Sequence, residues 1–164
     1  MSAARNSKLP IRIRSATAGD VPEMIRIVNA AFAIETFIEG PRTDEETMAE
    51  MSRTGEFLVA EDGGRLVACV YVERNGERGY FGMLAVDPPL QGKGIGRAMA
   101  EAAESYCRNL GCIAMDIAVL TLRPELLPLY QKLGYVETGT EEFRPSRPLK
   151  DGVVCHKIIL SKEL

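Results

Sequence analysis

The sequence predicts an α/β domain in which helices flank a mixed β-sheet. Segments with helical periodicity alternate with short runs that are apolar or that alternate apolar and charged residues. Three of the expected strands follow one another through hairpin signals, and no long linker or internal repeat divides the sequence. The 164 residues, 46% hydrophobic and 26% charged, therefore fit one globular domain that buries a substantial core.

The first third of the chain predicts a strand and two helices. Residues 10–16 alternate apolar and charged side chains, as in a half-buried strand. Apolar residues in the segment 21–32 recur at helical spacing, with Pro22 in the expected first turn. Residues 43–46 (Thr-Asp-Glu-Glu) match a capping box, which predicts a short helix that ends near Arg53.

Two hairpins are expected next. The segments 56–61, 65–74 and 79–86 are rich in apolar residues, which favours strands. They are joined by Asp-Gly-Gly at 62–64 and by Asn-Gly at 75–76, and glycine supplies the positive φ that tight hairpin turns require. The sequence therefore predicts three consecutive strands linked by short turns.

The remainder of the chain is expected to alternate helices and strands. A helix follows the glycine-rich turn, and its apolar face consists of Ile95, Met99, Ala102, Ala103, Tyr106 and Leu110. A buried strand, a helix closed by Gly134 and two last strands are expected at residues 112–119, 124–133, 135–142 and 153–160. The expected order is β-α-α-β-β-β-α-β-α-β-β.

Charge and cysteine content argue against several classes of function. The net charge of −3 shows no basic excess of the kind that nucleic-acid-binding proteins carry. The four cysteines are scattered and His156 is the only histidine, so a metal site, which needs about four ligands, is not expected. The N-terminus lacks the apolar region of a signal peptide, and no segment is long enough to span a bilayer. We expect a cytoplasmic protein that binds neither nucleic acid nor membranes and keeps its cysteines reduced.

The most informative segment is Gln91-Gly92-Lys93-Gly94-Ile95-Gly96. It follows an apolar strand and opens a helix. Glycines let the backbone approach a ligand closely, and the first N–H groups of a helix lack partners and carry partial positive charge. The segment therefore predicts a site for a phosphate or pyrophosphate.

Two common nucleotide-binding patterns do not fit this segment. The dinucleotide fingerprint Gly-x-Gly-x-x-Gly, counted from Gly92, would need glycine where Arg97 stands. The P-loop needs a serine or threonine after its lysine, whereas Lys93 is followed by Gly94.

The pattern that fits is Gln/Arg-x-x-Gly-x-Gly/Ala, matched at Gln91, Gly94 and Gly96. A second motif, Leu-Tyr-x-x-x-Gly-Tyr, occupies residues 129–135. With these two motifs and its element order, the chain resembles the GCN5-related N-acetyltransferase (GNAT) superfamily. The resemblance implies one domain over residues 9–164 after a flexible tail at 1–8, with a mixed, mostly antiparallel sheet of about seven strands flanked by about four helices.

The resemblance also implies acetyl-CoA as the cosubstrate and an N-acetyltransferase activity toward a primary amine. In this family the pyrophosphate binds the N–H groups of the glycine-rich turn, and the pantetheine arm binds the backbone of the preceding strand. The implied cofactor-binding residues are Leu84, Ala85, Val86, Gln91, Gly92, Lys93, Gly94, Ile95, Gly96 and Arg97.

Tyr130 is the catalytic candidate by the same resemblance. A tyrosine hydroxyl near the thioester can donate a proton to the departing CoA thiolate, and its high pKa suits a general acid. Without the family match, Tyr130 would be assigned to the core with neighbouring leucines.

The resemblance also implies that the thioester oxygen would accept a hydrogen bond from a backbone N–H near Leu84. Many relatives carry an asparagine after the fifth strand, where residues 121–124 are Thr-Leu-Arg-Pro, so no residue is assigned there.

The sequence leaves the general base open. Glu73, Glu35 and Glu39 are candidates, although each is expected to be a solvated surface carboxylate, as charged residues mostly are. The proton of the acceptor could also pass to His156 on the last strand or to a chain of waters.

The acceptor is also left open. The loop 33–41 contains glutamates that could attract a cationic amine, and the loop 143–152 contains Arg144, Arg147 and Lys150, which could attract a carboxylate. A small amine or amino-acid-like metabolite is the first hypothesis. A protein or peptide acceptor is the second, and a non-catalytic acyl-CoA sensor is the third. A homodimer is left open.

Overall fold

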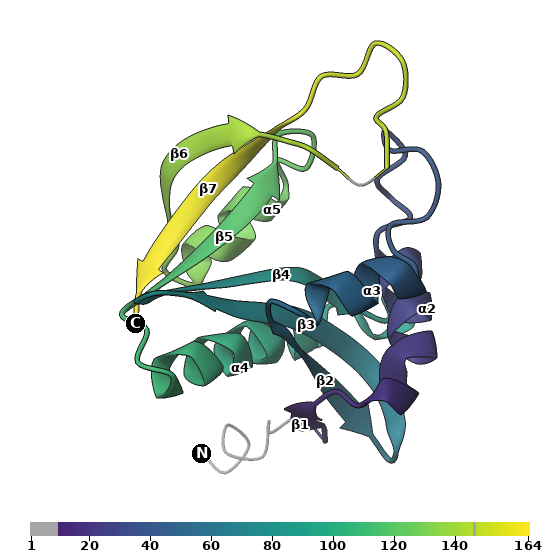
Figure 1. The fold of residues 1–164 in the computed structure, drawn as a ribbon, viewed down its shortest axis with the longest axis vertical. Helices are drawn as coiled ribbons and strands as arrows, with labels where there is room; N and C mark the ends of the chain where they lie inside the picture. The colour runs from purple at the N-terminus through teal and green to yellow at the C-terminus, as the bar shows by residue number, and fades with distance from the viewer. Residues whose placement is uncertain (1–9, 146) are drawn as a thin grey trace.

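The computed structural model describes residues 10–145 and 147–164, which form a twisted sheet with helices on both faces (Figure 1). Seven strands lie in the order β1-β2-β3-β4-β5-β7-β6. The strands are β1 Arg12–Ser15, β2 Glu56–Asp62, β3 Arg65–Asn75, β4 Arg78–Val86, β5 Ala114–Leu120, β6 Val136–Glu142 and β7 His156–Glu163. The helices are α2 Val21–Ala31, α3 Glu45–Met51, α4 Ile95–Asn109 and α5 Leu126–Lys132, with short 3-10 turns η1 Ala18–Asp20 and η2 Pro88–Leu90.

The sheet is antiparallel except where β4 meets β5. These two strands are parallel, and their ladder contains only the pairs from Arg78–Ala114 to Tyr80–Asp116. Beyond Tyr80 the strands diverge, and Figure 1 shows β5, β6 and β7 turning away from β4. The edge of β4 that faces β5 therefore has no strand partner over most of its length among the described residues.

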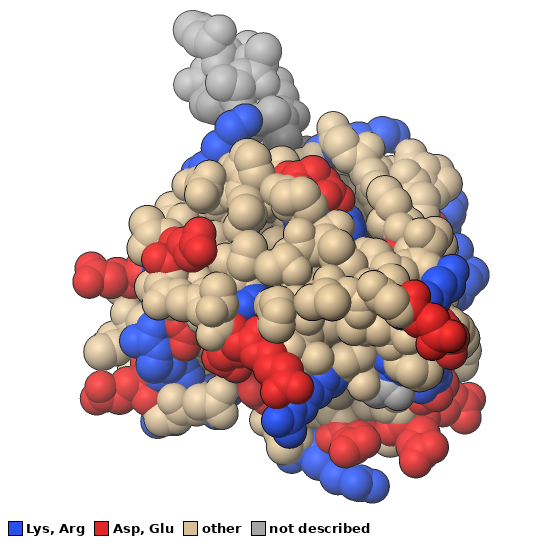
Figure 2. All heavy atoms as spheres, turned by 90° about the horizontal axis from the view of Figure 1, so that it is seen from above, with Lys and Arg blue, Asp and Glu red and all other residues tan. Residues whose placement is uncertain are grey.

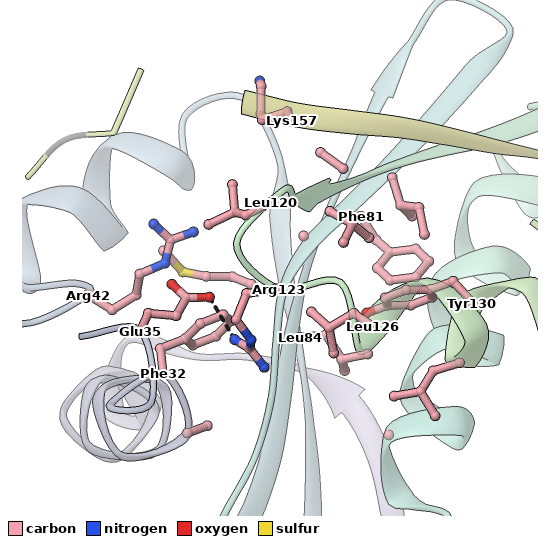
Figure 3. A pocket seen from close by; sticks show the side chains of 18 of the residues that line it. Phe32, Glu35, Arg42, Phe81, Leu84, Leu120, Arg123, Leu126, Tyr130 and Lys157 are labelled. Atoms are coloured by element: carbon pink, nitrogen blue, oxygen red, sulfur yellow. Dashed lines mark hydrogen bonds and ion pairs between the residues drawn. The ribbon is translucent and has the colours of Figure 1, made fainter. Parts of the chain in front are cut away.

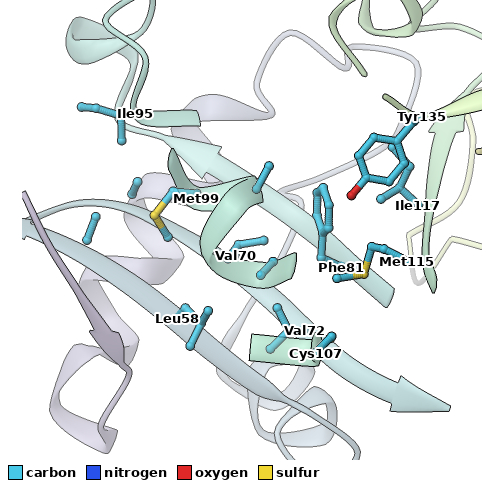
Figure 4. Close-up of a cluster of buried hydrophobic side chains, with 14 of the residues drawn as sticks. Leu58, Val70, Val72, Phe81, Ile95, Met99, Cys107, Met115, Ile117 and Tyr135 are labelled. Atoms are coloured by element: carbon cyan, nitrogen blue, oxygen red, sulfur yellow. The ribbon is translucent and has the colours of Figure 1, made fainter. Parts of the chain in front are cut away.

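Two apolar clusters, one on each face of the sheet, hold the fold together. The helix α4 packs on β2, β3 and β4, and its Met99, Ala103 and Cys107 are fully buried there with Phe81 and Tyr135 (Figure 4). On the opposite face α2 contacts β3 and β4, and the cluster contains side chains such as Met24, Ile27 and Tyr71. Burial of a large aliphatic or aromatic side chain contributes about 1.5–3 kcal/mol, so both clusters fix the position of β4.

The predicted element order is confirmed, and so are the mixed sheet of seven strands and the four helices. Residues 1–8, expected to be a tail, lie outside the described part of the chain.

No helix in the described residues is long and apolar enough to cross a membrane. Figure 2 shows acidic and basic side chains intermixed on the face that it presents.

Several predicted boundaries were wrong. The cap of α3 is Asp44, whose Oδ1 accepts the Thr47 N–H at 2.8 Å, whereas the backbone of Thr43 is held by the Asn29 amide. Leu110, predicted on the apolar face of α4, follows the helix end and is 40% exposed, because Gly111 with φ +91° ends the helix there.

The helix α5, the strand β5 before it and the last strand β7 also differ from the prediction. The helix α5 begins at Leu126 because residues 121–125 form turns. The strand β5 begins at Ala114, two residues later than predicted. The strand β7 runs on to Glu163 because this residue pairs with Ala114 across the sheet.

Candidate active site

The divergence of β4 and β5 opens a cavity of about 1030 Å³. Its walls come from both strands, from α2 and the loop that follows it, from the turn before α4, from α5 and from the segment after β6 (Figure 3). A cleft of this size, where two strands separate at the centre of a sheet, is a typical place for a small-molecule site.

The glycine-rich turn lies at one end of this cavity. Gly92 and Gly94 adopt φ of +81° and +87°, a region that favours glycine, and a Cβ placed on either would meet open space. The ladder of α4 begins where the N–H of Ala98 donates to the carbonyl of Gly94 at 3.1 Å. The N–H groups just before Ala98 are therefore not used by the helix and can bind an anion.

The predicted residues of this turn differ in their relation to the cavity. Gln91, Gly92, Ile95 and Gly96 line it, and the Gln91 amide donates to the Val86 carbonyl at 3.1 Å. Three predicted residues of the segment do not line it: Lys93 and Arg97 are exposed, with Arg97 paired to Glu101 at 3.0 Å, and Gly94 caps the helix.

The strand β4 carries a bulge where it faces the cavity. Its register against β3 shifts between the Cys69–Ala85 and Tyr71–Gly82 pairs, and Met83 has φ +50°. Met83 is the only non-glycine residue with positive φ in the described chain, and such strain is typical of functional sites. Leu84 and Val86 line the cavity, while Ala85 is buried against the α2 face of the sheet.

Tyr130 on α5 lies in the wall of the cavity beside Phe81 of β4. It is half-buried, and its ring centroid is 6.1 Å from those of Phe81 and Tyr135 (Figure 3). Burial raises the pKa of the Tyr130 phenol to about 12, against a smaller lowering by the Arg123 charge. The phenol therefore holds its proton near neutral pH, as a proton donor must.

The hydroxyl of the neighbouring Tyr135, by contrast, is held by a hydrogen bond. Its hydroxyl donates to Oε2 of Glu104 at 2.7 Å, and Nζ of Lys162 lies 3.1 Å from Oε1 of the same carboxylate. Burial, followed by the hydrogen bond to Glu104, raises the Tyr135 pKa. This group of three, in which Tyr135 and Glu104 are buried and Lys162 is half-buried, joins α4 to β7, and the Tyr135 ring packs against that of Tyr130.

The base candidates are spread over different parts of the molecule. Glu73 accepts a 2.6 Å hydrogen bond from Tyr71, and Glu39 and His156 are exposed. The expectation that Glu35 is a solvated carboxylate was wrong: it is 7% exposed, lines the cavity and accepts a 2.7 Å hydrogen bond from Arg123. The buried guanidinium of Arg123 compensates the buried charge of Glu35.

Two arginines in the cavity wall were not predicted. Arg123 lies just after β5, and Arg42 lies in the loop between α2 and α3, with its guanidinium carbon 5.2 Å from the centroid of the Phe32 ring. The position of Arg123 at the end of a buried strand was the available sequence signal. Arg42 directly follows the loop 33–41, and in that part of the sequence only the glutamates indicated a role in binding.

The two loops expected to select the acceptor lie against each other, and both contribute to the lining of the cavity. Ile38 and Leu149 form an antiparallel bridge, and the N–H of Glu39 donates to the carbonyl of Pro148 at 2.9 Å. The side chain of Arg147 pairs with Asp44, which ties the second loop to α3. Far-apart segments of the chain thus form one connected wall, which Figure 1 shows between α2 and β7.

Comparison with known proteins agrees with this geometry. The model of the acetyltransferase (GNAT) family matches residues 22–135, which include both motifs and the diverging strands. The chain belongs to the acetyltransferase (GNAT) family. The resemblance to this superfamily, predicted from the two motifs, is confirmed.

Individual GNAT proteins show the extent of the similarity. The chain is 26% identical over 141 residues to mycothiol acetyltransferase from Propionibacterium freudenreichii subsp. shermanii; the match covers 80% of this chain and 45% of that relative. The chain therefore spans less than half the length of this curated relative.

Solved structures share the fold over nearly the whole chain. The ribosomal-protein-S18-alanine N-acetyltransferase from Escherichia coli has a TM-score of 0.76 at 22% identity, with 93% of each chain covered. A phosphinothricin acetyltransferase from Sinorhizobium meliloti, solved with acetyl-CoA, has a TM-score of 0.75 at 20% identity, with 95% of this chain and 89% of that chain covered. The mixed sheet predicted for this fold is thus confirmed.

Proposed function

We propose that this protein transfers an acetyl group from acetyl-CoA to the primary amine of a small molecule or amino-acid-like metabolite. The observation that carries this proposal is the cavity between β4 and β5, which joins an anion-binding turn at one end to Tyr130 on its wall. Family membership and the acetyl-CoA complex of the Sinorhizobium meliloti protein support it.

The described residues fit the phosphates of acetyl-CoA. Gly92 and Gly94 give the turn its positive φ values and leave open space where a side chain would block a phosphate. The N–H groups from Gln91 to Arg97 would bind the pyrophosphate, and the exposed Lys93 and Arg97 would add positive charge near it.

The open edge of β4 fits the pantetheine arm. The backbone from Leu84 to Val86 has no strand partner on the side of β5 among the described residues, and the bulge at Met83 redirects it toward the cavity. Amide groups of the arm would bind this edge as an added strand would. The side chains of Leu84 and Val86 would contact the arm from the cavity wall.

The thioester supplies an activated acetyl group, and the protein's own residues would assist its transfer. The Leu84 N–H, or one next to it, would donate a hydrogen bond to the thioester oxygen as negative charge develops there. The Tyr130 hydroxyl would donate its proton to the sulfur when the carbon–sulfur bond breaks. The acceptor amine would approach from the side of Phe32, Glu35 and Arg42.

Two measurements test this proposal. Calorimetric titration with acetyl-CoA is expected to show binding to a single site per chain. Release of CoA thiol is then followed with a panel of amines, polyamines, amino acids and peptides, and we expect release with small amines. Release with peptides alone would favour a protein acceptor, and binding without release would favour a sensor.

The role of Tyr130 has its own test. Replacement Tyr130→Phe is expected to lower kcat by about 100-fold or more, the usual contribution of a general acid, with little change in acetyl-CoA affinity. Tyr106→Phe is the matched control, since the Tyr106 hydroxyl bonds Glu56 and does not line the cavity. Full turnover by Tyr130→Phe near neutral pH would exclude the phenol as the acid.

A further inference from the structure

One charged side chain in the cavity wall has no ion-pair partner among the described residues. Seven charged side chains take part in its wall: Glu35, Arg42, Arg123, Glu141, Glu142, Arg144 and Lys157. Six of them form three ion pairs, namely Glu35 with Arg123 at 2.7 Å, Glu142 with Arg144 at 3.0 Å and Glu141 with Lys157 at 3.8 Å. Arg123 is shared, since it also pairs with Glu125 at 2.7 Å outside the lining. Arg42 has no carboxylate within ion-pair distance among the described residues, so it is the lining cation without an ion-pair partner.

The position of Arg42 is nevertheless well defined. Its guanidinium lies over the ring of Phe32, with 5.2 Å from the guanidinium carbon to the ring centroid. Its Nε is buried and has no hydrogen-bond partner among the described residues. A buried N–H of this kind is costly unless something binds it, and a guanidinium edge is well shaped to hold a carboxylate by two parallel hydrogen bonds.

A second unsatisfied group faces the same part of the cavity. The side chain of Glu35 is 4% exposed; its Oε2 accepts from Arg123, but its Oε1 is buried without a partner in the part of the chain that the structure describes. Figure 3 shows the ends of Glu35 and Arg42 facing the same space beside Phe32. The site thus offers a hydrogen-bond acceptor next to a hydrogen-bond donor with a full positive charge.

These two groups are complementary to an amine that also bears a carboxylate. We propose that Arg42 binds a carboxylate of the acceptor while Oε1 of Glu35 accepts a hydrogen bond from its amino group, so that the substrate is an α-amino-acid-like amine. This inference rests on the proposed N-acetyltransferase function and narrows its acceptor. A dianion such as a phosphate fits less well, because a single unpaired cation beside the carboxylate of Glu35 would leave one negative charge uncompensated.

The other basic residues of the acceptor loops either form ion pairs or lie outside the cavity. Arg147 is bound to Asp44 and Arg144 to Glu142, and Lys150 is exposed outside the cavity. The sequence alone suggested that one loop attracts an amine and the other a carboxylate. In the structure Glu35 and Arg42, both in the segment between α2 and α3, can serve the two groups together.

The test compares each amino acid with its methyl ester and its decarboxylated amine. Methionine, leucine, phenylalanine, glutamate and lysine form the series, and CoA thiol release gives kcat and KM for each compound. For the amino acids that are accepted, we expect kcat/KM to exceed that of the ester by about 10-fold to 100-fold, the range of a hydrogen bond to a charged group.

Replacement of Arg42 identifies the residue responsible. Arg42→Gln is expected to raise KM for the amino acid by about 10-fold or more and to leave the ester nearly unchanged, so that the preference disappears. Arg42→Lys is expected to keep part of the preference, since it retains the charge without the planar edge. Arg53→Gln, an exposed arginine outside the cavity, is the control and should keep the full preference.

Unfolding temperature and acetyl-CoA affinity, measured for each variant, separate misfolding from a loss of recognition. Equal or faster turnover of the esters or decarboxylated amines by the unmodified protein would overturn the inference while leaving the proposed function intact. A preference for the acid that survives in Arg42→Gln would overturn it as well. Failure to bind acetyl-CoA or to release thiol with every acceptor would overturn the proposed function itself, and the inference with it.

Discussion

Arg123 and Glu35 are 88 positions apart in the sequence, and Nη1 of the arginine lies 2.7 Å from Oε2 of the glutamate. The pair joins the turn after β5 to the segment after α2 within the wall of the cavity. Both side chains are mostly withdrawn from solvent, at 14% and 4% exposed. Because removal from water is costly for each charge, the two charges are stable there only together.

Removal of the arginine should therefore destabilise the fold. Arg123→Ala leaves the buried Glu35 carboxylate uncompensated, and we expect the free energy of unfolding, measured in urea, to fall by about 3 kcal/mol. The double variant Glu35→Met/Arg123→Met should recover most of this loss, because it removes both charges and fills similar volume. Arg144→Ala, which breaks an exposed pair, should change stability by less than about 1 kcal/mol. An equal loss in the single and double variants would contradict this account of the pair.

The two glycines that begin α4 should respond differently to substitution. Gly94→Ala forces a Cβ into a residue with φ +87°, and we expect a loss of about 1–2 kcal/mol with weaker acetyl-CoA binding. Gly96→Ala is the comparison for stability: Gly96 lies in the first turn of the helix, and its new Cβ would meet Val86 at an ordinary 3.7 Å. For Gly96→Ala we expect the free energy of unfolding to rise by about 0.5–1 kcal/mol. Urea unfolding and calorimetry measure both quantities, and equal destabilisation by the two variants would contradict the geometry of the turn.

The fold could be predicted from the sequence to the level of element order. Strong local signals, such as the Asn-Gly turn at 75–76 and the helical spacing of Ile95, Met99 and Ala103, determine short-range structure. The errors occurred where a distant contact decides the outcome. Thr43 does not cap α3 because Asn29, 14 positions away, holds its backbone, and β7 extends to Glu163 because of its pairing with β5.

The active site could be predicted only in part, for a similar reason. The glycine-rich turn and Tyr130 lie in motifs whose residues are close in sequence, so a pattern can identify them. The acceptor wall is assembled from segments that are far apart in the sequence, such as Glu35 and Arg123 at a separation of 88 positions. Neither this pair nor the unpaired Arg42 leaves a local pattern. The expected roles of the charged residues also changed. Arg123 neutralises Glu35, whereas Arg42, which lies just outside the predicted loop, has no ion-pair partner among the described residues.

Acid should weaken the contact between β1 and η1. Asp20 accepts hydrogen bonds from Arg14 at 2.7 Å and from the Thr17 N–H at 2.7 Å, and the bonding with Arg14 is the main cause that lowers its pKa from 3.8 to about 2. Because the folded-state pKa is the lower one, the stabilisation is complete above about pH 4 and is lost as pH falls toward 2. After allowance for solvent screening, we expect the Asp20 carboxylate to contribute about 1–2 kcal/mol to the free energy of unfolding at neutral pH. Urea unfolding at pH 7 and at pH 2.5 should show Asp20→Asn clearly less destabilised at the lower pH, where the native carboxylate has begun to take up its proton, and an equal difference at both would contradict this assignment.

The pH dependence of turnover should identify the ionisation state of Tyr130. Burial raises its pKa to about 12, so the phenol keeps its proton over the whole range in which the enzyme can be assayed. The attacking amine must be neutral, so kcat/KM for an amino-acid acceptor should rise with pH as its amino group loses its proton, and it should not fall again while the phenol stays protonated. Tyr130→Phe should lower the whole curve without changing its shape, because no ionisation of the phenol contributes to it. A fall in rate between pH 8 and 10 that is present in the unmodified protein and absent in Tyr130→Phe would mean that the phenol loses its proton there, and burial would then not be what keeps Tyr130 protonated.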